Sequence, residues 1–196
     1  MIVCIIGTKS GCGKSSIVRE LLKQNRHRYI PWLMYTTRPI RNNEINGIDY
    51  HFITDEELMK MDNEKLFIEK REYYRTDGAY TYATRILEPS RAKSGIYIFM
   101  EQTMESAQNV QDFYSKKKIP VLNFLIDASE SVCIDRNIKR GGLAIEEIER
   151  RISSDNQLSW YPNLNITEKY INEYPEDLEK IVHSIKKRID LSEMLL

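Results

Sequence analysis

Cysteine is scarce in this sequence, and its three copies, Cys4, Cys12 and Cys133, are scattered and form no CxxC pair. An odd, scattered set excludes a disulfide framework and the ligand spacing of a zinc finger. Free cysteines of this kind are typical of a reducing compartment, so we expect a cytoplasmic protein.

Long hydrophobic runs are also missing. The longest clean apolar run near the start is Met1 to Ile6, which is far too short to span a membrane. No positively charged segment precedes it, so it lacks the pattern of a signal peptide. We interpret the run as a buried strand and expect no membrane partner.

The sequence has no excess of charge of either sign. Its 29 lysines and arginines balance 29 aspartates and glutamates. Domains that bind duplex nucleic acid are usually strongly basic, so this balance argues against a nucleic-acid partner while leaving room for a local basic pocket. A chain of 196 residues suits one domain, or a core that carries small inserted subdomains.

What the sequence does contain is a regular alternation of apolar strand-like runs and helical segments. Such alternation predicts an α/β fold with a parallel sheet and helices on both of its faces. The expected strands are Ile2–Ile6, Ile96–Met100, Val121–Ile126 and Tyr170–Ile171, and the expected helices are a segment from Ser15, Glu101–Ser115, Glu130–Lys139, Ile145–Gln157 and a closing helix from about Glu176.

The alternation is interrupted between about residues 36 and 85, where the pattern predicts a small β-rich insertion. Thr54 and Glu57 have the spacing of a capping box, so we expect a short helix to begin at Asp55. The expected strands are Trp32–Tyr35 before the insertion and Asp49–Ile53, Leu66–Glu69 and Ala79–Ala83 within it.

Residues 8–15, TKSGCGKS, match the phosphate-binding P-loop except at the first position, where Thr8 replaces the usual glycine and Gly7 stands just before it. Glycines let successive backbone N–H groups face an anion, and the following helix adds its dipole. Lys14 would reach the outer phosphates and Ser15 would ligate Mg²⁺. A glycine-rich turn that merely opens a helix is the alternative, but GKS between a strand and a helix favours a nucleoside triphosphate site. Its expected ATP-binding residues include Ser10, Gly11, Cys12, Gly13, Lys14, Ser15 and Ser16.

A second candidate anion site follows the P-loop. Arg38 and Arg41 lie three residues apart beside a proline, and Tyr50 follows in the stretch NGIDY. An arginine binds two phosphate oxygens at once, and a tyrosine hydroxyl adds a neutral donor. Taken alone, two arginines on a loop are more often exposed to solvent without binding a ligand. The choice between this interpretation and a phosphate site depends on the other motifs of the sequence.

The order of these motifs resembles the guanylate kinase family. A P-loop is followed by TTRxxR, by NGxDY, by Phe67-Ile68-Glu69 and by Tyr82-Ala83-Thr84, where the family usually has Tyr-Gly-Thr. The likeness continues through Arg136, Arg140 and Arg151 and covers nearly the whole chain. It implies a P-loop core at about 1–35, 86–126 and 160–196, an inserted nucleoside-monophosphate-binding subdomain at about 36–85, and a helical lid at about 127–159.

The resemblance also implies roles for single residues. Phosphoryl transfer needs alignment and several fixed cations around the moving group. Glu69 would accept hydrogen bonds from the guanine edge, and Asn172 would contact the adenine of ATP. The phosphate of the acceptor would be held by Arg38, Arg41, Tyr50 and Tyr82, and the residues expected to act on the transferring group are Lys14, Arg38, Arg136, Arg140 and Arg151.

The sequence departs from the family pattern where acidic residues are expected. The family stretch Asp-hydrophobic-Asp-x-Gln-Gly would place its two aspartates at Ile98 and Met100, while Gln102 matches. A family serine that contacts guanine corresponds to Met34. Because one of the missing acids helps to organise Mg²⁺ in the family, metal binding would depend on Ser15, the ATP phosphates and water.

These observations predict an ATP-dependent kinase that phosphorylates GMP or dGMP, releases ADP and uses Mg²⁺. Two other interpretations stay open. Loss of base contacts would suit a kinase of the same fold that acts on a phosphorylated sugar of the ribose bisphosphate type, although Glu69 and Tyr50 are retained. A non-catalytic protein-binding module of this fold would be expected to lose the P-loop residues, whereas Gly13, Lys14 and Ser15 are present. The sequence leaves open whether the protein is a monomer or a homodimer.

Overall fold

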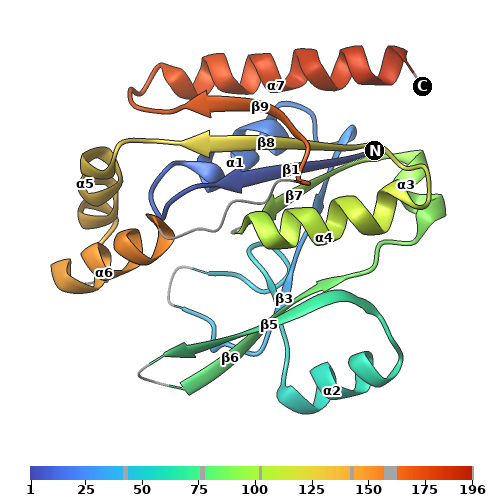
Figure 1. Cartoon of the computed structure of the whole chain (residues 1–196), viewed down its shortest axis with the longest axis horizontal. Helices are drawn as coiled ribbons and strands as arrows, with labels where there is room; N and C mark the ends of the chain where they lie inside the picture. Colours follow the sequence, from blue (N-terminus) through green and yellow to red (C-terminus); the bar gives the residue numbers. More distant parts are fainter. Residues whose placement is uncertain (42–43, 76–77, 102, 142–143, 157–162, 196) are drawn as a thin grey trace.

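The computed structural model describes residues 1–41, 44–75, 78–101, 103–141, 144–156 and 163–195. Its larger part is a five-stranded parallel sheet with the strand order β2-β7-β1-β8-β9 (Figure 1). The predicted α/β class with a parallel central sheet is therefore confirmed. The strands are β1 (Ile2–Gly7), β2 (Tyr29–Trp32), β7 (Ile96–Glu101), β8 (Val121–Asp127) and β9 (Ile166–Ile171).

Strand β1 lies in the middle of this sheet, and every one of its residues is buried. Val3 and Ile5 belong to one hydrophobic cluster, whereas Ile2 and Ile6 belong to another. Successive side chains of a strand point to opposite faces, so a central parallel strand needs apolar residues at every position. The continuous apolar run at the start of the chain meets this requirement and carries the P-loop at its C-terminal end.

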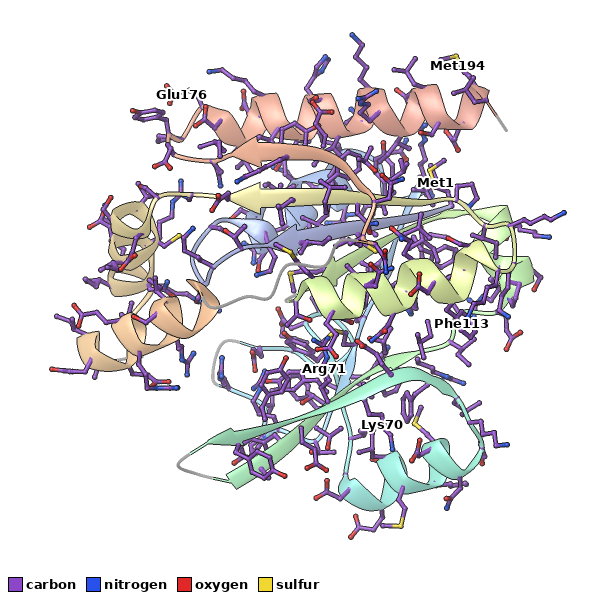
Figure 2. All side chains as sticks on the ribbon, in the orientation of Figure 1. Met1, Lys70, Arg71, Phe113, Glu176 and Met194 are labelled. Atoms are coloured by element: carbon purple, nitrogen blue, oxygen red, sulfur yellow. The ribbon has the colours of Figure 1, made fainter. Side chains whose placement is uncertain are left out.

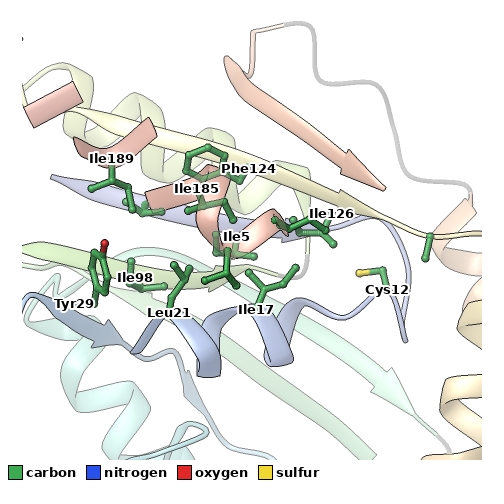
Figure 3. Packing of buried hydrophobic residues seen from close by; sticks show 14 of the residues in the cluster. Ile5, Cys12, Ile17, Leu21, Tyr29, Ile98, Phe124, Ile126, Ile185 and Ile189 are labelled. Atoms are coloured by element: carbon green, nitrogen blue, oxygen red, sulfur yellow. The ribbon is translucent and has the colours of Figure 1, made fainter. Parts of the chain in front are cut away.

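Helices cover both faces of the central sheet. On one face, Ile17 and Leu21 of α1 (Lys14–Gln24) and Ile185 and Ile189 of α7 (Asp177–Met194) pack against the strands (Figure 3). On the other face lie α4 (Met104–Ser115), which buries Ala107, Val110 and Tyr114, and the short α3 (Pro89–Ser94), which buries Ala92. The two faces therefore hold separate cores, and the core between β1 and α1 fixes the direction in which α1 leaves the P-loop.

A second, four-stranded sheet with the order β4-β3-β6-β5 lies beside the central one (Figure 1). Its helix begins where the sequence predicts, because the backbone N–H of Glu57 donates to the Thr54 hydroxyl (3.2 Å) and the Glu57 carboxylate accepts from the Thr54 N–H (2.8 Å). The elements are β3 (Tyr35–Thr36), β4 (His51–Phe52), α2 (Asp55–Asn63), β5 (Phe67–Arg75) and β6 (Gly78–Arg85).

Two helices, α5 (Glu130–Arg140) and α6 (Ile145–Asn156), stand at the carboxyl end of β8 (Figure 1). The hydroxyl of Ser129 caps α5 by accepting a hydrogen bond from the backbone N–H of Val132. Cys133 of α5 and Ile148 of α6 are buried in the same cluster as Cys12 of the P-loop. This packing brings the start of α5 against the P-loop.

The run Trp32–Tyr35, predicted as one strand, is divided between the two sheets. Strand β2 ends at Trp32, whose ring packs against Phe99 of the central sheet with centroids 4.6 Å apart. Strand β3 begins at Tyr35, which pairs with Ala83 in the second sheet. The chain therefore passes from one sheet to the other within this run.

Other boundaries also differ from the prediction. Helix α4 begins at Met104 rather than Glu101, because Glu101 ends β7 and the Thr103 hydroxyl caps the helix. Strand β9 covers Ile166–Ile171, whereas the sequence predicted only Tyr170–Ile171. Helix α3 was not predicted. Over the part of the chain that the structure describes, no helix combines the length and apolar character needed to cross a membrane.

Candidate active site

The P-loop connects the C-terminal end of β1 to α1. Gly11 and Gly13 have φ values of +89° and +101°, in the left-handed region that favours glycine. A Cβ atom at Gly11 would also lie 2.6 Å from the carbonyl oxygen of Cys133, so a larger residue would clash with α5. The first turn of α1 contains no acidic residue. The N-terminal end of α1, with its helix dipole, therefore has the character of the anion site that the sequence predicts.

Lys14 and Ser15 are the first residues of α1. A Cβ atom at Gly7 would lie 2.6 Å from Cδ of Lys14, so this glycine leaves room for the lysine stem. The Ser15 hydroxyl lies 3.3 Å from the sulfur of Met100 near the end of β7. The start of α1 thus carries an ammonium group suited to outer phosphates and a hydroxyl suited to Mg²⁺.

Side chains from outside the loop hold three consecutive P-loop carbonyls. The carbonyl oxygens of residues 10, 11 and 12 accept hydrogen bonds from Asn137 (3.1 Å), Arg136 (3.4 Å) and Asn172 (2.8 Å), respectively. We call these three donors the carbonyl clamp. Asn137 and Asn172 are buried. A buried amide without a hydrogen-bond partner destabilises the fold, and the hydrogen bonds to the loop remove this cost. The clamp therefore fixes the backbone of the loop from α5 and from the end of β9.

Two clamp residues have contacts other than those the resemblance implies. The guanidinium of Arg136, expected at the transferring phosphoryl group, also donates to the carbonyls of Asn172 (2.9 Å) and Glu173 (3.4 Å). Asn172, expected at adenine, binds the P-loop backbone with its side chain and the carbonyl of Asp127 with its N–H (2.8 Å). In this structure both residues support the loop, and their contacts with nucleotide stay predictions.

The other two arginines expected in the lid, Arg140 and Arg151, lie farther along the chain than the carbonyl clamp residues of α5. Arg140 is exposed at the end of α5, and the side chain of Arg151 on α6 is half-buried. Arg151 donates to Glu147 at 2.6 Å, and Arg150 binds the same carboxylate at 2.7 Å. Hydrogen bonds from Arg150 and then Arg151 lower the pKa of Glu147 to about 2.

In the loop that follows β3 of the second sheet, Arg38 is the centre of a buried basic group. Its guanidinium binds both carboxylate oxygens of Glu44 at 2.8 and 2.9 Å and donates to the Tyr82 hydroxyl at 2.8 Å. It also lies over the rings of Tyr50 and Phe52, at 5.4 and 5.3 Å from their centroids. Burial opposes ionisation of Glu44, but hydrogen bonds from Arg38 outweigh it and lower the pKa of this carboxyl.

The residues predicted to hold an acceptor phosphate therefore lie together. Tyr50 and Tyr82 pack edge to face with centroids 5.8 Å apart. The side chain of Arg41 is exposed, and its backbone N–H donates to Glu44 at 3.0 Å. Two arginines against one carboxylate give the group a net positive charge, which favours an anion.

Glu69, the predicted reader of guanine, lies in a polar cluster between β5 and α4. Its side chain is only 9% exposed and is paired with Arg71 at 3.0 Å (Figure 2 labels Arg71 between these elements). The carboxylate also accepts hydrogen bonds from Thr84 (3.3 Å), Ser106 and Asn109 (2.6 Å). The carboxylate therefore joins the second sheet to the core of the fold.

Sequence reasoning missed three members of this cluster. Arg71 follows Glu69 by two positions on a strand and so shares its face, which was a usable signal. Ser106 and Asn109 are three apart on α4 and also share a face, but only the fold shows that this face meets β5.

The positions where the family pattern has polar residues are apolar here. Met34 and Ile98 are buried, and Met100 contacts Ser15. A thioether is a soft ligand that does not suit Mg²⁺, and the described residues hold no group of three or more His, Cys, Asp or Glu side chains that would bind a metal. The donor set fits a Mg²⁺ ion only through Ser15, with phosphates and water as the other ligands. Gln102 lies outside the described residues.

Comparison with known proteins agrees with this geometry. The guanylate kinase of Mannheimia succiniciproducens is 32% identical over 154 residues, which are 76% of this chain and 70% of that protein. The guanylate kinase of Clostridium perfringens is 29% identical over an alignment of 204 residues, which covers 100% of this chain and 89% of that protein.

The fold is shared with a crystal structure of guanylate kinase from Anaplasma phagocytophilum, with a TM-score of 0.63 and 18% identity over 99% of this chain and 86% of that one. A family model described as guanylate kinase matches residues 1–186. Because this match spans most of the sequence, and a 32% identical relative covers more than two thirds of it, the chain belongs to the guanylate kinase family.

Proposed function

We propose that this protein transfers the γ-phosphoryl group of ATP to GMP or dGMP, giving GDP or dGDP and ADP. The observation that carries the proposal is that one fold holds two candidate anion sites: the P-loop before α1, and the basic group of Arg38, Arg41 and their tyrosines beside the second sheet. The names of the relatives support the same activity.

On the donor side, the glycine-rich backbone would bind the phosphates of ATP. Because the carbonyl clamp binds the carbonyls of residues 10–12 from outside, it would restrain the loop before ATP arrives. Preorganised N–H groups lose little entropy on binding. Lys14 would then neutralise charge on the outer phosphates, beside the remaining loop residues Ser10, Gly11, Cys12, Gly13, Ser15 and Ser16.

Magnesium, bound together with ATP, supplies positive charge that stabilises the phosphates during transfer. Ser15 is the residue of this chain that would hold it. Since Met100 replaces an acidic residue beside Ser15, the protein would offer few ligands of its own, and the ion would arrive mainly as the ATP complex.

On the acceptor side, Arg38, Arg41, Tyr50 and Tyr82 would hold the phosphate of the nucleotide. Guanine carries N1–H and a 2-amino group side by side, and the carboxylate of Glu69 can accept both hydrogen bonds. To do so it would exchange donors that it now binds, such as Asn109.

The transfer itself needs little covalent help. An oxygen of the acceptor phosphate attacks the γ-phosphorus in line, the bond from that phosphorus to the bridging oxygen breaks, and ADP leaves with the electron pair. The role of the chain is to align the two nucleotides and to surround the moving group with positive charge. Lys14 would supply this charge at the P-loop, Arg38 and Arg41 together would supply it at the second site, and Arg140 and Arg151 would approach from α5 and α6.

The domain division follows from this mechanism. Residues of about 36–85 would form the subdomain that binds the monophosphate, about 127–159 would form the lid, and the remaining segments would form the core. Closure of the subdomain and the lid would exclude water from the γ-phosphate, which prevents hydrolysis of ATP. ATP and GMP are the partners of this proposal.

The direct test is ADP release with ATP–Mg²⁺ and a panel of acceptors: GMP, dGMP, AMP, UMP and a ribose bisphosphate. We expect GMP and dGMP to be phosphorylated far faster than the others. Faster turnover of the ribose bisphosphate would favour the sugar-phosphate interpretation. No ADP release with any acceptor, in a folded protein that binds GMP, would favour a non-catalytic module.

A further inference from the structure

The carboxylate of Asp127, the last residue of β8, contacts the first half of the P-loop. Its Oδ1 accepts hydrogen bonds from the Thr8 hydroxyl (2.5 Å) and from the Lys9 ammonium (2.7 Å). The same oxygen accepts from the backbone N–H of Ala128 at 3.0 Å. Its Oδ2 pairs with Lys169 of β9 at 2.9 Å. One carboxylate thus joins the loop to two strands of the central sheet.

These contacts explain how Thr8 is accommodated where the P-loop pattern has glycine. In the described part of the chain, the non-glycine residues with positive φ are Lys65 and Lys118, so Thr8 does not need a glycine-like backbone. Its N–H donates to the carbonyl of Ile126 at 3.0 Å, and its hydroxyl donates to Asp127. Both the main chain and the side chain of Thr8 are therefore anchored to the end of β8.

The charges around Asp127 also determine how Lys9 is bound. Lys9 and Asp127 have side chains that are 15% and 19% exposed, so their ion pair is largely shielded from water. Burial opposes ionisation of Asp127, but hydrogen bonds from Lys9, Thr8 and Lys169 hold its pKa well below the usual range. Lys9 is consequently bound to an ionised carboxylate.

We propose that Asp127 is a positioning residue of the ATP site: it holds residues 8 and 9 of the P-loop, as the carbonyl clamp holds residues 10–12, and it keeps Lys9 away from the phosphates. This proposal rests on the proposed function, because it takes ATP as the ligand of the loop. The side chain acts through Thr8 and Lys9 and does not touch the nucleotide.

The test is a double-mutant cycle on the affinity for ATP–Mg²⁺, measured by titration without any acceptor. Thr8→Val removes the hydroxyl with little change in shape, and Asp127→Ala removes its acceptor. We expect each variant to weaken ATP binding about tenfold. The double variant should bind ATP about as weakly as the weaker-binding single variant, because both changes remove the hydrogen bond between Thr8 and Asp127. GMP affinity should stay unchanged in all three.

Two further variants distinguish a positioning role of Asp127 in ATP binding from an effect on the stability of the fold. Thr8→Ser keeps a hydroxyl and should restore ATP affinity to within about twofold of the native protein. Lys169→Met removes a partner of the same carboxylate that does not contact the loop. It should leave ATP affinity unchanged even where it lowers the melting temperature.

Additive effects of Thr8→Val and Asp127→Ala, or equal loss of ATP and GMP affinity in step with the melting temperature, would overturn the proposal. If the native protein binds ATP but does not phosphorylate GMP, the proposed function fails while the cycle still decides the role of Asp127. If it binds no ATP, the role of Asp127 is overturned as well.

Discussion

Glu44 binds the guanidinium of Arg38 at two points, with N···O distances of 2.8 and 2.9 Å, inside the site expected to receive the acceptor phosphate. This guanidinium is buried and its orientation is fixed by Tyr82 as well. An incoming phosphate would therefore meet an arginine that is already oriented. Because Glu44 neutralises one positive charge, the exposed Arg41 has to supply the charge that attracts the phosphate.

Replacing Arg41 should accordingly abolish acceptor binding without affecting the donor. Arg41→Ala should remove the protection that GMP gives against thermal unfolding, since only a ligand that binds the native state stabilises it. Protection by ATP should survive. Arg85→Ala is a matched control, because this arginine on β6 pairs with Tyr35 and lies outside the proposed phosphate group. Loss of ATP protection in Arg41→Ala would show that the two phosphate sites are assigned the wrong way round.

Lys14 should be indispensable for turnover but not for folding. Lys14→Ala removes the charge expected on the outer phosphates, and we expect kcat to fall about a hundredfold or more. Lys23→Ala, on the same helix with a side chain that is 72% exposed, should retain activity. The measurement is ADP release with saturating GMP, beside the melting temperature of each variant. Normal ADP release from Lys14→Ala would contradict the proposed function.

Glu69 should distinguish guanine from adenine. Adenine presents a bare N1 acceptor and no 2-amino group, so the carboxylate would lose both hydrogen bonds and face a lone pair. We expect AMP and UMP to be poor substrates, IMP to be modestly worse than GMP because it keeps N1–H, and Glu69→Gln to lower kcat/KM for GMP about a hundredfold.

The control for Glu69 is Asn109→Ala, which removes a donor to the same carboxylate but no group expected at the base. It should leave the order of the substrates unchanged. Equal kcat/KM values for AMP and GMP in the native protein would mean that Glu69 does not read guanine.

Two buried tyrosines offer a paired test of stability. The Tyr114 hydroxyl accepts from the N–H of Leu87 and donates to its carbonyl, both at 2.8 Å. Tyr114→Phe leaves these two backbone groups unpaired, so it should lower the free energy of unfolding by about 1–3 kcal/mol. Among the described residues, the buried Tyr29 hydroxyl has no hydrogen-bond partner, so Tyr29→Phe should be neutral or stabilising. Equal losses in urea denaturation would contradict this difference.

Glu147 should contribute to the resistance of α6 to acid. Hydrogen bonds from Arg150 and Arg151 lower its pKa to about 2 from an ordinary value of 4.5. A lowered pKa in the folded state means that the contribution is present above pH 4.5 and is lost as the pH falls towards 2. Stability measured between these limits should decline less steeply in Glu147→Gln than in the native protein. Parallel curves would show that these ion pairs do not stabilise the fold.

The parts of the fold that the sequence predicted are those set by local patterns. Strand β1 is apolar throughout because both of its faces are buried, and α2 begins at a capping box of four residues. Strand β9 was mostly missed, because it lies at the edge of the sheet and polar residues fill its middle. The division of Trp32–Tyr35 depends on which sheet each residue joins, and this is decided by contacts with distant strands.

The candidate site likewise contains residues that a local motif reveals and residues that only the fold brings together. The glycines and Lys14 of the P-loop stand in one short motif, so the sequence alone was enough to propose the donor site. Asp127 and Asn137 meet the loop across separations of 119 and 127 residues, which no local pattern reveals. The available hint for Asn137 was its place four positions after Cys133, on the same face of α5 as this buried cysteine.

The carbonyl clamp has a consequence for how the lid would swing. Arg136 and Asn137 donate hydrogen bonds to P-loop carbonyls, so a rigid rotation of α5 away from the loop would break these bonds. We therefore expect the hinge of the lid to lie after Asn137. Gly141 ends the helix with a φ of +71°, and a Cβ atom there would meet nothing within 4 Å. We therefore expect the moving part of the lid to be α6 and the end of α5, which carry Arg151 and Arg140, while α5 up to Asn137 stays with the P-loop.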